Sequence, residues 1–121
     1  MFRFPQKEKL KSKKTIDFLF SSGKTISKFP LLLFYQFEPT EGLPSCKMTV
    51  AVSKKKYKRA VDRNLIKRRI KESYRLQKYE LIDRLEGHDL NLIFVYTGKE
   101  ILSFDKIFSA IKKLIKNLIE K

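Results

Sequence analysis

The stretch from residue 60 to residue 75, A-V-D-R-N-L-I-K-R-R-I-K-E-S-Y-R, constrains the fold more than any other part of the chain. At about 100° per residue, a helix here separates its side chains into two sectors. The apolar sector, which can pack on a sheet, consists of Ile66, Ile70, Ser73 and Tyr74. The other sector is almost uniformly basic and consists of Arg63, Asn64, Lys67, Arg68, Lys71 and Arg75. A rigid row of cations of this kind favours a polyanion as its partner.

The overall charge supports the same interpretation. The chain of 121 residues has 28 Lys and Arg against 13 Asp and Glu, which gives a net charge of +15. Self-repulsion disfavours a compact protein with such a charge, so a large anionic partner is the natural explanation. Phosphates along a nucleic-acid backbone suit the basic row, and Asn64 can read a base edge or a 2′-hydroxyl. From the charge alone, a solvated basic surface without a partner stays an alternative.

The periodicity of the remaining chain predicts three further kinds of segment. Ile16, Leu19 and Phe20 recur at helical spacing after a possible N-cap at Ser12, which predicts a helix over 13–22 that ends at Gly23. Strands are predicted over 31–37, 47–53 and 90–96, and a cationic loop over 54–59. The central helix should span 60–78, with a further turn or two to residue 86. A closing helix should follow Ser103, and its apolar stripe favours a core helix over a short coiled-coil dimer.

These elements predict a single domain over residues 1–121, which begins with a basic, partly flexible lead-in over 1–11. The order α-β-β-α-β-α is typical of a small α+β sandwich, with one sheet packed against helices. Both faces of the first strand are apolar, so we expect each face to meet a helix or a bound chain. In the second strand, Thr49, Ala51 and Ser53 form a face of small side chains that leaves room above it. Phe20 and Phe34 fit either a core or a stacking surface.

Several function classes lack the residues that they require. Cys46 is the single cysteine, which excludes an internal disulfide and fits a reducing cytosol. We find no Ser-His-Asp set, no P-loop and no metal-ligand spacing, so the chain should hold neither catalytic residues nor a metal. No apolar run is long enough for a membrane span, and the N-terminus has no signal-peptide core. The common DNA-binding motifs also fit poorly.

The segment V-S-K-K-K-Y-K-R-A-V-D-R-N-L-I-K-R-R-I-K-E-S-Y-R, residues 52–75, resembles the protein component of bacterial ribonuclease P. The family signature consists of pairs that here are Ala60-Val61, Arg63-Asn64, Lys67-Arg68 and Lys71-Glu72, with a later Arg75. The similarity extends over nearly the whole chain. This sequence departs from the pattern at Leu65 and Lys71, where the motif often has Arg. Its basic loop is also one residue longer than the common form and lacks a glycine.

The resemblance implies a fold similar to the second domain of ribosomal protein S5 (S5 domain 2-like), with a mixed sheet. It also implies an uncommon left-handed β-α-β crossover around the central helix, against the usual handedness rule. The implied function is that of an RNA-binding auxiliary subunit of a tRNA 5′-maturation endoribonuclease. The catalytic RNA of that enzyme removes the 5′ leader of precursor tRNA and holds the Mg²⁺, so no tightly bound cofactor is expected in the protein.

The resemblance also assigns residues to two binding surfaces. The catalytic RNA would contact Lys54, Lys55, Lys56, Lys58, Arg59, Arg63, Asn64, Lys67, Arg68, Lys71 and Arg75. The substrate leader would lie in a cleft lined by Ile16, Phe20, Leu32, Phe34, Ala51 and Ser53. The protein would be a cytoplasmic monomer in a 1:1 complex with the RNA, with no membrane or DNA partner.

The residues alone leave three alternative functions to consider. A different RNA-binding structural protein, such as a ribosomal protein or an RNA chaperone, has the same composition. A self-contained nuclease would need acid-base or metal groups that are missing. A basic helix on a membrane surface is a further alternative, although the apolar face of the central helix is narrow.

Overall fold

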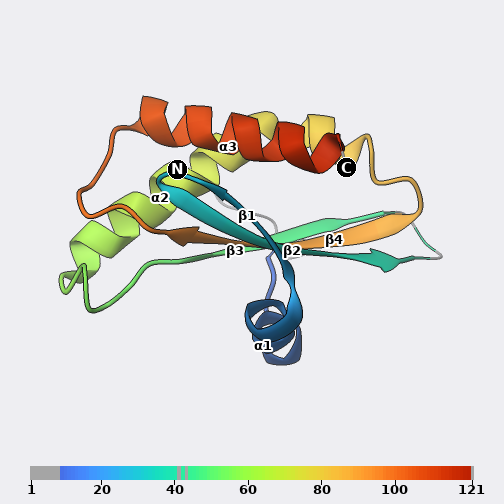
Figure 1. Cartoon of the computed structure of the whole chain (residues 1–121), viewed down its shortest axis with the longest axis horizontal. Helices are drawn as coiled ribbons and strands as arrows, with labels where there is room; N and C mark the ends of the chain where they lie inside the picture. The colour runs from blue at the N-terminus through green and yellow to red at the C-terminus, as the bar shows by residue number, and fades with distance from the viewer. Residues whose placement is uncertain (1–8, 41, 43, 121) are drawn as a thin grey trace.

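A four-stranded sheet with helices on both faces forms the framework of the protein (Figure 1). The computed structural model describes residues 9–40, 42 and 44–120. The elements are α1 (Lys13–Ser22), β1 (Lys24–Lys28), β2 (Leu31–Pro39), β3 (Cys46–Ala51), α2 (Ala60–Ile82), β4 (His88–Tyr96) and α3 (Phe104–Ile119). Helices α2 and α3 lie on one face of the sheet, and α1 lies on the other (Figure 1). The predicted α+β class is therefore confirmed.

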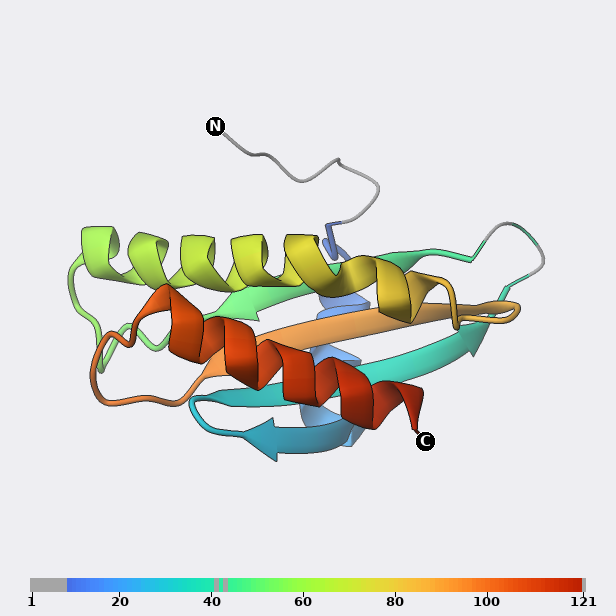
Figure 2. The same cartoon turned by 90° about the horizontal axis from the view of Figure 1, so that it is seen from above.

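The sheet is mixed, with the strand order β1-β2-β4-β3. The pairs β1/β2 and β2/β4 are antiparallel, whereas β3/β4 is parallel and is connected by α2. Figure 2 views the sheet from the side of α2 and α3, with β3 and β4 both pointing left. In this view β4 lies below β3 while α2 passes in front of them, so the crossover is left-handed. This agrees with the expectation from the family and departs from the general rule.

The predicted elements occur in the predicted order, and one strand was missed. The first helix spans the predicted residues, and Ser12 Oγ accepts the N-capping hydrogen bond from Thr15 N at 3.3 Å. Between α1 and β2, the segment K-T-I-S-K forms β1 at the edge of the sheet. Its short length and the lysines at both ends are typical of edge strands, and they leave little hydrophobic signal in the sequence. Strand β4 begins at His88, two residues before the predicted start.

The main core lies between the sheet and the pair α2 and α3. Ile66 and Ile70 of α2 are fully buried, and Tyr74 is 1% exposed. The apolar stripe of α3 packs in the same cluster, together with Leu92 and Phe94 of β4. This placement confirms the core interpretation of the closing helix. Within the described residues, no helix combines the length and apolar character that a membrane crossing requires.

The opposite face of the sheet carries only α1 and a smaller cluster. Leu19 is fully buried against Leu10 and Ile93. The end of the predicted lead-in is fixed here, because Lys9 pairs in parallel with Met48 and Leu10 N donates to Met48 O at 3.0 Å. Residues 1–8 of the lead-in lie outside the described part of the chain. The face is thus partly covered, and both flanks of α1 remain accessible.

Candidate nucleic-acid interface

The cationic loop, residues 54–59, is anchored to the body of the protein by Tyr57. This residue is 7% exposed, and its hydroxyl donates a hydrogen bond to Gly98 O at 2.8 Å. Its ring packs edge-on against Tyr96, with 5.9 Å between centroids. Burial raises the pKa of Tyr57, which keeps the hydroxyl protonated as a donor. The other members of the loop, Lys54, Lys55, Lys56, Lys58 and Arg59, are exposed to solvent.

Arg63 connects this loop to the first turn of α2. Its Nη1 group donates to Tyr57 O at 2.8 Å and to Lys58 O at 2.9 Å. Arg63, which was predicted to contact RNA, is therefore hydrogen-bonded within the protein. It holds the loop backbone from which the exposed lysines project. In the described structure its Nε and Nη2 groups have no such partner, so the residue can still donate to an anion.

The outward side of α2 brings several predicted cations together. Asn64 and Arg68 are exposed, and Lys67 and Lys71 are half-buried. Partial burial lowers the pKa of Lys71, and the nearby charges of Lys67 and Lys9 lower it further. Crowding of three ammonium groups is unfavourable for the free protein and is relieved by a bound anion. Sequence reasoning did not assign Lys9 to this group, because its position depends on the parallel pairing with Met48.

Two further arginines of α2 are engaged within the protein. Arg75 forms an ion pair with Glu72, and its Nε lies 3.2 Å from Oε2 of that carboxylate. The hydrogen bond from Arg75 lowers the pKa of Glu72, so the carboxylate stays ionised and offsets part of the arginine charge. Arg69 donates to Leu102 O at 2.6 Å and fixes the connection between β4 and α3. The basic residues of α2 are therefore not equivalent as ligands for an anion.

The residues predicted to line the leader cleft gather on one flank of α1. We call this surface the aromatic flank; it consists of Ile16, Phe20, Leu32, Phe34, Ala51 and Ser53. The rings of Phe20 and Phe34 meet edge-on with 5.0 Å between centroids and an interplanar angle of 66°. Phe20 remains 46% exposed, so this pair is not closed into the core. The aromatic flank thus presents ring faces and edges to solvent.

The aromatic flank extends across the sheet to the cationic loop. Leu32 and Ala51 both pair with Val95, so the three residues form one row across β2, β4 and β3. Ser53 follows the end of β3, and its carbonyl accepts from Tyr57 N at 3.0 Å. The last member of the aromatic flank is thereby part of the turn that holds the lysines. The two predicted surfaces are contiguous.

The described part of the chain contains no group of three or more His, Cys, Asp or Glu side chains that could hold a metal ion. Cys46 is buried at the start of β3, and Tyr74 Oη donates to its Sγ at 2.9 Å. Cys46 thus serves as a small buried residue at the start of a strand.

The sequence model of the Ribonuclease P family matches residues 4–119 of the chain. The chain belongs to the ribonuclease P protein component family. The ribonuclease P protein component of Porphyromonas gingivalis is 31% identical, over 93% of this chain and 83% of that protein. The corresponding protein of Chlorobaculum tepidum is 34% identical, over 95% and 82% of the two chains.

Solved structures of ribonuclease P proteins share the fold. The protein from Thermotoga maritima superimposes with a TM-score of 0.68 at 20% identity and covers 91% of this chain and 96% of its own. The Staphylococcus aureus protein gives a TM-score of 0.67 at 19% identity, with 92% and 94% covered. The chain is thus an auxiliary subunit of ribonuclease P with a role in tRNA 5′ processing. Family membership implies partnership with ribonuclease P RNA and precursor tRNA.

Proposed function

We propose that the chain binds two RNA segments at once, through two adjoining surfaces. The outward side of α2 and the cationic loop bind the catalytic RNA, and the aromatic flank binds the 5′ leader of precursor tRNA. The observation that carries this proposal is the contiguity of the surfaces at Ser53, where the aromatic flank meets the loop anchored by Tyr57. A protein docked on the catalytic RNA would then hold the leader next to it.

The chemistry of the aromatic flank suits a single strand. Exposed aromatic side chains stack with bases of any sequence and contribute about 1–3 kcal/mol per base. Phe20 offers nearly half of its surface to solvent, and Phe34 lies in contact with it. The small side chain of Ala51 leaves space beside these rings, and the lysines at the end of the flank can neutralise the leader phosphates.

The catalytic centre of the proposed complex lies in the RNA. We infer that Mg²⁺ is held mainly by the RNA and that the protein carries no catalytic residue. Its contribution is to bind the leader and to stabilise the active RNA, so that endonucleolytic cleavage leaves the mature 5′ end. We also propose that the protein is a monomer that forms a 1:1 complex with the RNA in the cytoplasm.

A reconstitution assay tests this division of labour. The protein, a bacterial ribonuclease P RNA and precursor tRNA are mixed at low Mg²⁺, and the 5′ end of the product is mapped. We expect correct cleavage only when the protein and the RNA are both present. Cleavage by the protein alone would identify a self-contained nuclease, and no stimulation by the protein would identify a different RNA-binding protein.

A further inference from the structure

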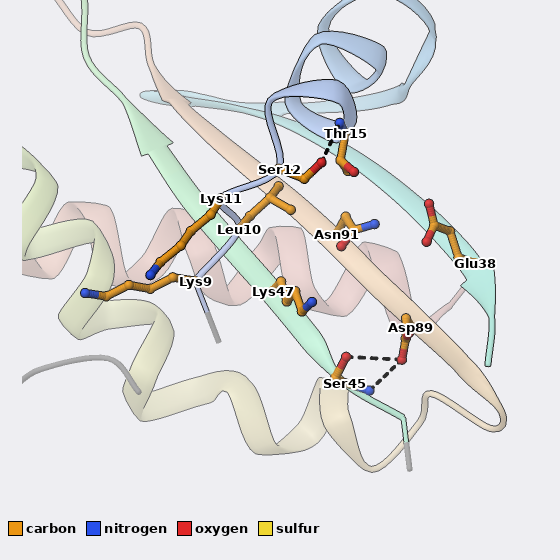
Figure 3. A pocket seen from close by; sticks show the side chains of 10 residues that line it. All are labelled: Lys9, Leu10, Lys11, Ser12, Thr15, Glu38, Ser45, Lys47, Asp89 and Asn91. Carbon is orange, nitrogen blue, oxygen red and sulfur yellow. Dashed lines mark hydrogen bonds between the residues drawn. The ribbon is translucent and has the colours of Figure 1, made fainter. Parts of the chain in front are cut away.

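The second flank of α1 contains a pocket of about 290 Å³ (Figure 3). At 100° per residue, Thr15 and Phe20 project to opposite sides of α1 around the buried Leu19. Thr15 lines the pocket, so the pocket and the aromatic flank are separated by the helix. The functions assigned to the aromatic flank and to α2 leave this pocket without a role.

Asn91 is the residue of the pocket that most needs a partner. It is 6% exposed, and its side chain extends from β4 into the pocket (Figure 3). Among the described residues, none forms a hydrogen bond with its amide group. A buried polar group without a partner costs roughly 1–3 kcal/mol, so a ligand that pairs with the amide is favoured.

The charges around Asn91 have both signs. Lys47 of β3 pairs with Asn91 of β4. Asp89 lies two residues before Asn91 on β4, and so on the same face of the sheet, and it pairs with Glu38 of β2. Oδ1 of Asp89 accepts hydrogen bonds from Ser45 N at 2.9 Å and from Ser45 Oγ at 3.1 Å, which orients the carboxylate (Figure 3). Lys9 and Lys11 also line the pocket, but their ammonium groups point away from Asn91 and toward α2 (Figure 3). Around Asn91 the pocket therefore combines one ammonium group, an amide and two carboxylates, in contrast to the cationic side of α2.

This mixture of groups selects among ligands. A lone phosphate is repelled by the two carboxylates. A metal ion is repelled by Lys47, and the described residues offer no acidic cluster that could hold it. The Watson–Crick edge of guanine places two N–H donors beside a carbonyl oxygen, which matches carboxylate and amide acceptors beside an ammonium donor. The volume lies near the lower end of the usual range for ligand pockets, about 300–1,000 Å³, and suits a single base.

We propose that this pocket binds one unpaired guanine base of an RNA strand. Asn91 and the carboxylates of Glu38 and Asp89 pair with the donors of the base, and Lys47 donates to its carbonyl oxygen. The inference goes beyond the leader and catalytic-RNA surfaces, and it rests on the proposed function only in that the partner is RNA. It assigns to α1 a binding surface on each flank.

Nucleotide titration of the whole, ¹⁵N-labelled protein tests the proposal, with the side-chain amide resonance of Asn91 as the readout. We expect a saturable shift with guanosine 5′-monophosphate, and binding about tenfold weaker or worse with the adenosine and cytidine monophosphates. Glu38→Gln should weaken binding of the guanosine nucleotide by about tenfold. Glu80→Gln, on the exposed surface of α2, should leave this affinity unchanged. In Asn91→Leu, whose folding is checked by circular dichroism, binding is followed by the backbone amide resonances of β4, and the preference for guanine should be abolished.

Three results would overturn the assignment. Equal shifts with all nucleotides and with inorganic phosphate would mean that lysines bind phosphate without reading a base. No shift would mean that water satisfies Asn91. Binding of guanosine monophosphate, without tighter binding of an oligouridine that contains one guanosine than of an all-uridine strand, would exclude an RNA base. The cleavage assay is independent, so intact cleavage with failed guanine binding removes this inference alone.

Discussion

Helices α1 and α2 lie on opposite faces of the same sheet, and they are attached to it in different ways. Helix α2 is held by Ile66, Ile70 and Tyr74, all buried, and its outward side is charged. Helix α1 buries only Leu19 completely and leaves Phe18 and Phe20 each 46% exposed. The longer helix is therefore fixed by three large buried side chains, whereas the shorter one is fixed by a single fully buried leucine and keeps two phenylalanine rings nearly half exposed.

This difference fits the two RNA-binding roles that we propose for the helices. The core fixes the direction of α2, so its cations form a rigid row that suits the phosphates of a folded RNA. Helix α1 covers only part of its sheet face and leaves room for bases on both flanks. Stability of the fold should therefore depend mainly on α2, and recognition of unpaired bases on α1.

The largest effect on stability is expected from Ile70→Ala. Deletion of a fully buried side chain removes its transfer free energy and leaves a cavity, so we expect the free energy of unfolding to fall by about 2–5 kcal/mol. Urea unfolding measures this loss. The control is Leu76→Ala on the same helix, which is 52% exposed and should change the free energy by less than about 0.5 kcal/mol. Similar losses in both variants would show that α2 is not held by its buried side.

A smaller and more local effect is expected from Leu19→Ala. Leu19 packs in the small cluster with Leu10 and Ile93, so its truncation should cost about 2–3 kcal/mol and mainly release α1. Hydrogen exchange should accelerate in α1 well before α2, and leader affinity should fall while affinity for the catalytic RNA is kept. Phe18→Ala is the control on the exposed side. Equal acceleration in both helices would contradict the separate attachment of α1.

For the cations of α2, Arg68→Ala should change the salt dependence of binding. Arg68 is exposed, so its loss should reduce the slope of log K against log salt for the catalytic RNA by about 0.7–0.9 unit per lost phosphate contact. The control is Lys112→Ala, an exposed cation on α3, which removes the same charge away from α2. An unchanged slope for Arg68→Ala, or an equal change in both variants, would remove Arg68 from the phosphate contacts.

Much of the fold could be predicted because periodicity and caps are local signals. Ser12 and Gly23 mark the ends of α1, and the apolar stripe from Phe104 to Ile119 marks α3. Strand β1 escaped prediction because its pairing with β2 depends on the hairpin, and its five residues carry only one partly buried apolar side chain, Ile26. The left-handed crossover followed from family resemblance, because general rules favour the opposite hand.

The position of the basic residues on α2 could be predicted from the sequence, but their hydrogen-bond partners could not. The spacing of the basic residues placed Arg63 and Arg75 on the cationic side, but it could not show that backbone carbonyls and Glu72 engage them. Such partners depend on side-chain directions and on the path of a loop. Asn91 gave no signal at all, because a single Asn in a strand becomes informative only when its burial and missing partner are known.

The most direct test of leader binding compares two substrates in the reconstituted complex. The binding free energy of precursor tRNA with its leader is measured against that of mature tRNA, for the unmodified protein and for Phe34→Ala. Phe37→Ala is the control, because Phe37 is an exposed ring on the same strand but on its other face. We expect Phe34→Ala to reduce the leader-dependent difference by about 1–3 kcal/mol and to leave mature tRNA unaffected. Equal losses for both substrates, with a lower melting temperature, would show that Phe34 serves the core and would contradict leader binding on the aromatic flank.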